Sequence, residues 1–271
     1  MILETEKKLF LLDIDGTICI GAEWIPGAKE FLSEIRESGA EFVFITNNTT
    51  RGVSEYITWF QQQGVPTDPS NYMTASMVTT RYMKEQRREE LYYVLGTPAL
   101  IRELKRQGIP VTTNAADSRI TTVCISYDNT LTYDKLTDVC RLLTNPNISY
   151  IATNQDLTCP IEFGYVPDCG SICQMVGNAT NRIPRYLGKP GKSMIEYALQ
   201  EHQCEKEDAI IVGDRLYTDI ASGNRSNVDT VLVLTGESKV GDIVNSEHKP
   251  TFILNSIREI RNKNVKSQII A

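Results

Sequence analysis

The sequence predicts an α/β fold in which a parallel sheet is flanked by helices and a second α/β domain is inserted into the first. Three observations predict this class. Short β-rich runs alternate with amphipathic stretches, which is typical of βαβ units. Several of these runs end in polar clusters, and ligands bind outside the carboxyl ends of strands in open α/β sheets. The stretch between two of these clusters is far longer than a single crossover needs.

The first predicted strand covers residues 9–14, and a helix follows it. Pro26 opens the helical pattern, and Gly39 closes it in the usual C-terminal glycine position. The next strand is expected at 41–45 and leads into a helix over 53–63, before Gly64. A helix at 193–201 and a strand at 208–212 complete the pattern. These elements predict the sheet of one Rossmann-like domain.

The middle of the chain predicts a second domain. Asn48 and Lys189 are 141 residues apart, whereas a βαβ crossover takes about 30 residues. The segment between them has its own alternation, with strands expected at 91–95, 121–126 and 150–152 and helices at 98–107 and 133–143. We therefore expect residues 1–80 and 186–271 to form a discontinuous core, and residues 81–185 to form an inserted α/β domain.

Composition and charge limit the classes of partner that we expect for this protein. The formal charge of −6 at pH 7 argues against a basic surface for polyanions, so we expect no nucleic-acid partner. No segment approaches the length of a membrane span, and no early apolar run suits a signal peptide. We therefore expect no membrane partner and a cytoplasmic location, where the seven cysteines would be free thiols. A homo-oligomer is left open.

Two carboxylates, Asp13 and Asp15, follow the first predicted strand. They could be turn residues, since Asp and Gly favour turns. A calcium loop also begins Asp-x-Asp, but its sixth and twelfth positions need Gly and Glu, and here they hold Ile18 and Trp24. Polar clusters recur after the strands at 41–45 and 208–212, and this recurrence favours a shared site over a turn.

The residue types in these clusters suit phosphoryl transfer. Several acids cannot gather at one sheet edge without a cation, because like charges raise one another's pKa values. Magnesium is the natural choice, being a hard ion that takes oxygen ligands. With the metal present, Asp13 can be both ligand and nucleophile and form an acyl phosphate. If Asp15 binds the metal through its main-chain oxygen, its side chain can donate a proton to the leaving alkoxide and later accept one from water.

The phosphoryl group would be held by two further clusters. Lys189 and the Thr46 hydroxyl, with amides around Asn47, would neutralise its oxygens. Alone, Lys189 would be read as a solvated surface lysine, and Asn48 has a second interpretation as the cap of the following helix. The predicted substrate-binding residues are Thr46, Asn47, Asn48 and Lys189.

Four ordered motifs resemble those of the haloacid dehalogenase superfamily, and within it the NagD-like branch of nitrophenyl and small-molecule phosphatases. They are Asp13-x-Asp15-Gly16-Thr17, Thr46-Asn47-Asn48, Lys189-Pro190 and Gly213-Asp214-Arg215-x-x-Thr218-Asp219. The resemblance implies a catalytic core with a large α/β cap inserted between the second and third motifs. It also implies Mg²⁺ bound by Asp13, Asp15 and Asp214, with Asp219 near or behind the metal.

We therefore expect a phosphatase that hydrolyses a small phosphomonoester, such as a nucleotide or a sugar phosphate, through an aspartyl phosphate. A dehalogenase of the same superfamily is disfavoured because it needs neither Asp15 as an acid nor a magnesium site. A non-catalytic phosphosugar-binding regulator would tolerate loss of Asp13 or Asp15, and both are present. The resemblance also places the cap loop at 156–160 above the phosphate, where Cys159 would contact the leaving group or be one more buried thiol.

Overall fold

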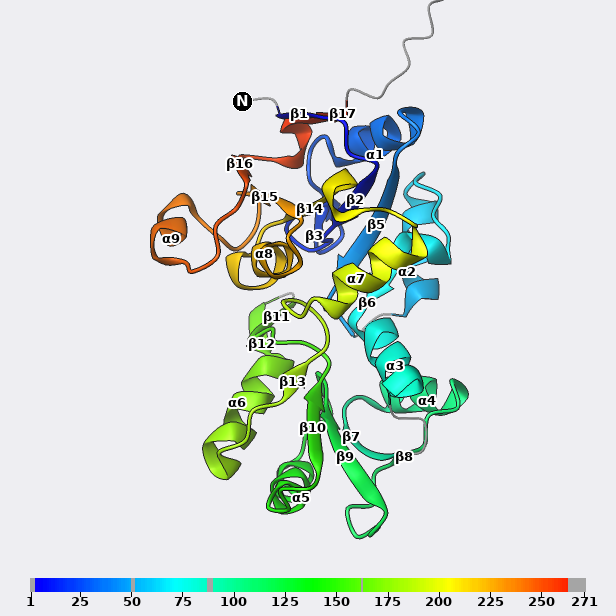
Figure 1. Ribbon diagram of the computed structural model, residues 1–271, viewed down its shortest axis with the longest axis vertical. Coiled ribbons are helices and arrows are strands. Elements are labelled where there is room, and N and C mark those ends of the chain that lie inside the picture. The colour runs from blue at the N-terminus through cyan, green and yellow to red at the C-terminus, as the bar shows by residue number, and fades with distance from the viewer. Residues whose placement is uncertain (1–2, 50–51, 87–89, 162, 263–271) are drawn as a thin grey trace, which may run out of the picture. The chain divides into compact units, whose positions relative to one another are not determined.

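The computed structural model describes residues 3–49, 52–86, 90–161 and 163–262 (Figure 1). The chain divides into two compact units. The first comprises Met1–Thr46, Val53–Met73 and Lys192–Ala271, and the second comprises Asn47–Gly52 and Thr74–Gly191. Both contain a sheet with helices, which agrees with the predicted α/β class. The division into a catalytic core and a cap at residues 80/81 and 185/186 stays a prediction.

The main sheet of the first unit has the strand order β16-β15-β14-β2-β5-β6. Its strands are β2 (Leu9–Leu12), β5 (Glu41–Thr46), β6 (Tyr72–Thr74), β14 (Ala209–Gly213), β15 (Asp229–Val233) and β16 (Phe252–Leu254). β2 pairs in parallel with both β14 and β5. The chain builds one half of the sheet outward from β2 and the other half outward from β14. The carboxyl ends of these two strands therefore lie at the topological switch point, where ligands bind in folds of this class.

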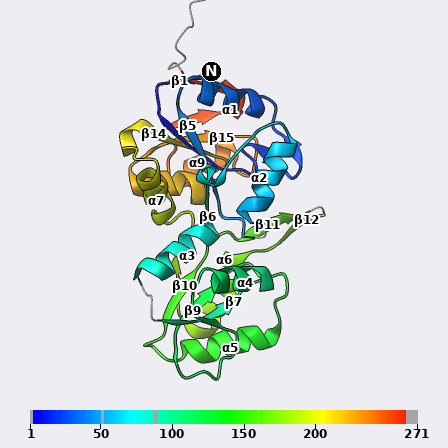
Figure 2. The ribbon, with the colours of Figure 1, turned by 90° about the vertical axis from the view of Figure 1, so that its right-hand side faces the viewer.

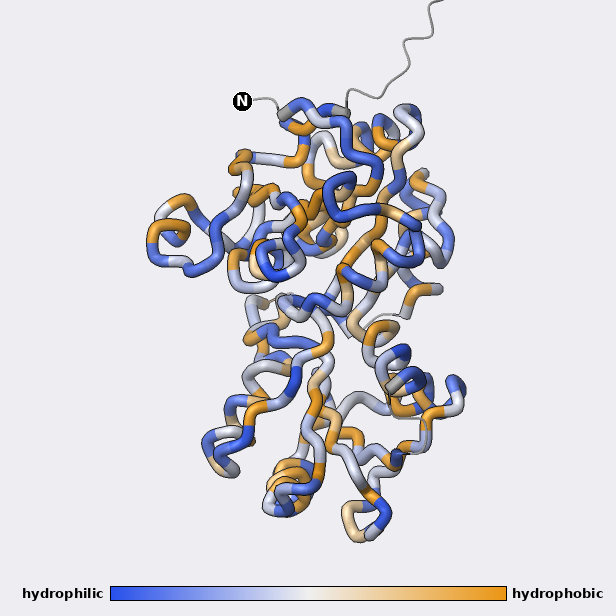
Figure 3. The backbone as a smooth tube through the Cα atoms, in the orientation of Figure 1, coloured by the Kyte–Doolittle hydropathy of each residue, from blue (hydrophilic) through white to orange (hydrophobic). Residues whose placement is uncertain are grey.

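Helices and short hairpins complete the first unit. The helical elements are α1 (Ala28–Glu37), α2 (Val53–Gln62), α7 (Ser193–Glu201), α8 (Ala221–Ser226), α9 (Val240–Asn245), and the short turns η1 (Pro69–Asn71), η2 (Lys206–Asp208), η3 (Leu216–Ile220) and η4 (Ile257–Glu259). The remaining strands pair as β1 (Leu3–Thr5) with β17 (Ile260–Asn262) and as β3 (Cys19–Ile20) with β4 (Glu23–Trp24). α1 buries Phe31, Leu32 and Ile35 on one face, as the helical period requires. The central strands are apolar (orange in Figure 3) and form the core.

The second unit has its own sheet, in the order β13-β10-β9-β7-β8. Its strands are β7 (Leu91–Leu95), β8 (Val111–Thr112), β9 (Ile120–Ile125), β10 (Ser149–Ala152) and β13 (Arg185–Tyr186), and its helices are α3 (Ala75–Gln86), α4 (Pro98–Arg106), α5 (Tyr133–Leu143) and α6 (Cys169–Thr180). Neighbouring strands are parallel. A separate antiparallel hairpin, β11 (Thr158–Ile161) with β12 (Gly164–Pro167), extends away from this sheet (Figure 2).

The predicted elements are largely confirmed. The strand at Leu91–Leu95 and the helices at Tyr133–Leu143 and Ser193–Glu201 have the predicted bounds. The first strand, expected at 9–14, ends at Leu12 because the chain turns at the acids that follow. Neither the β11–β12 hairpin nor α6 was predicted. Within the described ranges, no helix is both long enough and apolar enough to cross a membrane.

Candidate active site

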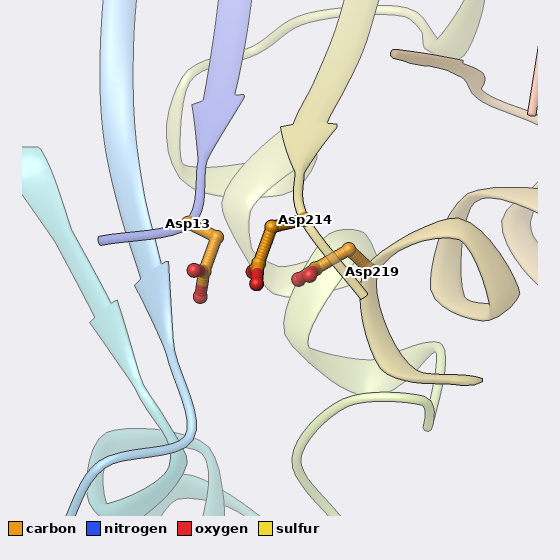
Figure 4. A group of neighbouring side chains, drawn as sticks. All are labelled: Asp13, Asp214 and Asp219. Atoms are coloured by element: carbon orange, nitrogen blue, oxygen red, sulfur yellow. The ribbon is translucent and has the colours of Figure 1, made fainter. Parts of the chain in front are cut away.

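Three buried carboxylates of the first unit lie together, and we name Asp13, Asp214 and Asp219 the carboxylate cluster. Their ligand oxygens lie within 4.8 Å of one another, and the side chains point toward a common region (Figure 4). The exposed fractions of these residues are 8%, 2% and 0%. Asp13 directly follows β2 and Asp214 directly follows β14. The switch point of the sheet therefore carries the acids that the sequence placed at strand ends.

The chain around β14 brings Asp219 to the cluster. Asp219 belongs to η3, one turn after Asp214, and its Oδ2 accepts a hydrogen bond of 3.1 Å from the Arg215 amide. Gly213 makes this approach feasible, because a Cβ there would lie 2.3 Å from the Asp219 Cγ. Asp219 is expected near or behind the metal. Its carboxylate lies among the ligand atoms of the cluster.

A loop that the sequence analysis did not select supports Asp214. The Glu237 amide donates to Asp214 Oδ2 over 2.6 Å, and the Thr235 hydroxyl donates to the Gly16 carbonyl over 2.6 Å. A Cβ on Gly236 would lie 2.0 Å from Asp214 Oδ2. The signal in the sequence was a Thr-Gly pair shortly after an apolar strand, a fourth polar strand end like the other three.

Two further predicted site residues lie near the cluster. Asp15 is close to Asp13 in sequence, and Thr46 is close to it in the register of the sheet. Asp15 is half-buried and forms an isolated backbone bridge with Cys19, and the described carboxylate cluster does not include its side chain. Thr46 ends β5 and is 2% exposed. Since Leu12 pairs with Phe44, Thr46 lies level with the residues that follow β2. Thr46 is therefore at the same edge of the sheet as Asp13.

The other predicted site residues belong to the second unit. Asn47 and Lys189 are 4% and 2% exposed, and Asn48 is half-buried. Asn47 Oδ1 accepts from the Lys189 amide at 2.9 Å, and its Nδ2 donates to the Lys189 carbonyl at 2.9 Å. The structure thus brings Asn47 and Lys189 together, as predicted for one site. It also shows that the Asn47 side chain binds main chain, so any contact of Asn47 with phosphate falls to its backbone amide.

The cap loop expected above the phosphate is only partly exposed. Cys159 is 8% exposed in β11, and Asp156 is 7% exposed. The burial of Cys159 favours the interpretation as a buried thiol. The position of the loop over the phosphate stays a prediction.

The donor set of the carboxylate cluster suits a hard divalent cation. Three buried carboxylates at this separation would repel one another if all were ionised without a counter-charge. Mg²⁺ prefers carboxylate oxygens and keeps water positions for a phosphate ligand. The residues present therefore fit the metal that the sequence predicts.

Comparisons with known proteins agree with this geometry. A family model described as haloacid dehalogenase-like hydrolase matches residues 10–110, and a second, described as HAD-hydrolase-like, matches residues 186–260. The acid sugar phosphatase of Staphylococcus aureus (strain MRSA252) is 30% identical over 94% of this chain and 96% of its own length.

Solved structures of phosphatases also align with most of this chain. A 4-nitrophenylphosphatase from Thermotoga maritima aligns with a TM-score of 0.85 and 33% identity over 93% of this chain and 95% of its own. NagD from Escherichia coli K-12 aligns with a TM-score of 0.82 and 31% identity over 94% and 98%. A glycerol phosphate phosphatase from Mycobacterium tuberculosis, solved in complex with magnesium, aligns with a TM-score of 0.84 and 27% identity over 94% and 76%.

Proposed function

Since the chain belongs to the haloacid dehalogenase-like hydrolase family and is a NagD-like phosphatase, we propose that it hydrolyses small phosphomonoesters through an aspartyl phosphate on Asp13, with Mg²⁺ as cofactor. The observation that carries this proposal is the carboxylate cluster at the switch point between β2 and β14. A nucleophilic carboxylate must work beside a cation, because its target is an anion. The cluster offers both the nucleophile and the ligands.

Asp13 is the proposed nucleophile and Asp15 the proposed proton carrier. A carboxylate oxygen of Asp13 attacks phosphorus, and the bond between phosphorus and the leaving oxygen breaks. Asp15 donates a proton to that leaving oxygen, then takes a proton from the water that attacks the acyl phosphate and releases inorganic phosphate. The half-buried position of Asp15 outside the carboxylate cluster supports this separate role.

The proposed metal ligands are the carboxylates of Asp13 and Asp214 and the main-chain oxygen of Asp15, with Asp219 as the acid beside them. Bound there, Mg²⁺ would neutralise charge on the phosphoryl oxygens. The loop at 235–238 holds the Asp214 carboxylate through the Glu237 amide. A magnesium complex of the mycobacterial relative supports the choice of metal.

Thr46, Asn47, Asn48 and Lys189 are the proposed contacts of the phosphoryl group. The Thr46 hydroxyl and the Lys189 ammonium would stabilise the charge on the phosphoryl oxygens. Asn47 would contribute its main-chain amide, since its side chain already binds the Lys189 peptide. The role of Asn48 rests on its place in the motif and on its partial exposure.

The proposed substrates are small phosphomonoesters such as sugar phosphates or glycerol phosphate. The relatives carry names that specify acid sugar, 4-nitrophenyl and glycerol phosphate phosphatases. These names disfavour the two alternatives from the sequence analysis, a dehalogenase and a non-catalytic regulator. They also leave the choice among phosphomonoesters to a substrate panel.

Phosphate release tests the proposal. The purified protein, freed of metal with EDTA, is assayed on 4-nitrophenyl phosphate, glycerol phosphate and a sugar phosphate. We expect no release without metal, recovery with Mg²⁺, and poor recovery with Ca²⁺, whose larger and looser ligand shell misplaces the nucleophile. Turnover that is unchanged by EDTA, or full activity in Ca²⁺, would overturn the metal assignment. Binding of these esters without turnover would support the regulator.

A further inference from the structure

Three segments of the second unit meet in a hydrogen-bonded group, which we name the amide knot: Asn47, Asn154, Asp156, Gly188 and Lys189. These residues come from positions as far apart as 47 and 189 in the chain. Each segment bonds to the next through buried groups. Two of these segments belong to the motifs proposed to bind phosphate. The third, at 153–156, does not.

The side chain of Asn47 clamps the peptide of Lys189. Its Oδ1 accepts from the Lys189 amide at 2.9 Å while its Nδ2 donates to the Lys189 carbonyl at 2.9 Å. One planar amide thus satisfies both main-chain groups of a single residue. Because both bonds are buried, each is costly to lose. The clamp fixes the backbone from which the Lys189 side chain extends.

Asp156 supplies a further acceptor to the same Asn47 amide. Asn47 Nδ2 also donates to Asp156 Oδ1, over 3.1 Å. An ionised carboxylate only accepts hydrogen bonds, so it selects the NH₂ end of the Asn47 amide. The reversed amide would turn its oxygen toward both the Asp156 carboxylate and the Lys189 carbonyl. Asp156 and the Lys189 peptide therefore favour the same orientation of the Asn47 amide.

Neighbouring groups hold Asp156 and the clamp in place. The Asp156 amide donates to Asn154 Oδ1 at 3.0 Å, and Asn154 Nδ2 donates to the Asn47 carbonyl at 3.1 Å. The Gly188 amide donates to the Thr153 carbonyl at 2.7 Å. A Cβ on Gly188 would lie 2.6 Å from Asn47 Oδ1, so the glycine allows the clamp to close.

We infer that Asp156 is a positioning residue for phosphate binding, acting through the Asn47 amide on Lys189. This inference rests on the proposed contact between Lys189 and the phosphoryl group. Removal of the Asp156 carboxylate takes away one of the three hydrogen bonds that hold the Asn47 amide, and so loosens its grip on the Lys189 peptide. A displacement of the order of 1 Å in a group that binds the reacting atoms costs about 10²-fold in rate. We expect an effect of about 10- to 100-fold, smaller than that of removing Lys189 itself.

Asp156→Ala tests the inference through phosphate affinity. The readouts are the inhibition constant of inorganic phosphate, kcat and KM for 4-nitrophenyl phosphate, and the thermal midpoint. We expect the inhibition constant and KM to rise about 10-fold or more, and Asp156→Asn, whose side chain still offers an acceptor oxygen, to recover most of the loss. If Asp156→Ala does not fold, Asp156→Leu, which fills the space without an acceptor, takes its place.

Asp128→Ala is the matched control. Asp128 is also buried in the second unit, at 5% exposure, and its carboxylate binds Thr130 and Lys135 outside the amide knot. Loss of this ion pair should lower the thermal midpoint at least as much, with the phosphate inhibition constant unchanged. Equal changes in phosphate affinity for both variants would reduce Asp156 to a stability role and overturn the inference.

A double-mutant cycle with Lys189→Ala separates the two proposals. If Asp156 acts through Lys189, Asp156→Ala adds little in the Lys189→Ala background. Fully additive losses would overturn the positioning role while leaving the Lys189 contact intact. If Lys189→Ala alone leaves the phosphate inhibition constant unchanged, the proposed contact fails and the inference fails with it.

Discussion

The carboxylate cluster and the amide knot both bury polar groups, but they differ in how the charges and hydrogen-bonding atoms of these groups are balanced. The cluster gathers like groups, three carboxylates whose ligand oxygens lie within 4.8 Å of one another. The knot matches donors with acceptors, so that the Asn47 amide, the Asp156 carboxylate and the Lys189 peptide satisfy one another. If all three carboxylates of the first arrangement are ionised, their repulsion calls for a cation. The second is complete within the chain.

This difference separates a binding site from its support. Where like charges are buried together, the free energy of unfolding depends on whether a counter-ion is bound there. A matched hydrogen-bond network makes a rigid support that is independent of ligand. We therefore expect the stability of the first region to respond to metal, and that of the second region to be independent of metal.

Among changes that leave every carboxylate in place, the largest loss of turnover is expected for Gly236→Ala. The new methyl group would lie 2.0 Å from Asp214 Oδ2, so the carboxylate or the loop must move by about 1 Å, which costs about 10²-fold in turnover. Gly241→Ala is the control, because no atom outside its own helix lies within 4 Å of the added Cβ. Steady-state kinetics of both variants check this expectation. Equal activity of the two variants would show that the loop does not position Asp214.

The second-largest expected effect is that of Mg²⁺ on the thermal stability of the protein. A ligand that binds only the folded state at 100 times its dissociation constant stabilises that state by about 2.7 kcal/mol. We expect Mg²⁺ to raise the thermal midpoint of the wild type and of Asn47→Leu, which leaves the carboxylate cluster intact. In Asp214→Asn the magnesium response should be lost. A magnesium response that disappears in Asn47→Leu and persists in Asp214→Asn would contradict the assignment of the metal site to the carboxylate cluster.

The smallest expected effect concerns the reactivity of buried and half-buried thiols. Burial raises the pKa of Cys124 to about 12 and also raises that of Cys169. A disulfide reagent at pH 8 should therefore label the half-buried Cys140 and Cys204 before these two, with activity unchanged. A thiol whose pKa is raised by folding destabilises the protein only above its unfolded value, near 9. Stability should therefore fall between pH 9 and 12, as a pH series of denaturant titrations would show.

The sequence predicted the family, the α/β class and the carboxylates because their signals are local. The helix at Ser193–Glu201 follows from a period of apolar residues within one segment. Asp13 and Asp214 follow apolar strands directly. An acid at the end of a buried strand is visible without knowledge of the partner strand. The neighbours β2 and β14 then bring the acids together.

The amide knot could not be predicted in the same way. Asn47 and Asp156 are separated by 109 residues, and only the closed fold shows that they bond. The amides around Asn47 were expected to help bind phosphate, but no local pattern indicated that the Asn47 side chain binds the Lys189 peptide. Hydrogen-bond partners depend on three-dimensional register, and a sequence pattern does not encode that register.

The most direct test of the account is acid-quenched labelling with a ³²P-labelled phosphomonoester in the presence of Mg²⁺. We predict transient label on the protein that hydroxylamine removes, as for an acyl phosphate, and that maps to the peptide containing Asp13. Asp13→Asn should carry no label, lose at least about a thousand-fold in turnover, and still bind inorganic phosphate. Label on another residue, or steady turnover by Asp13→Asn, would contradict the assignment of Asp13 as the nucleophile.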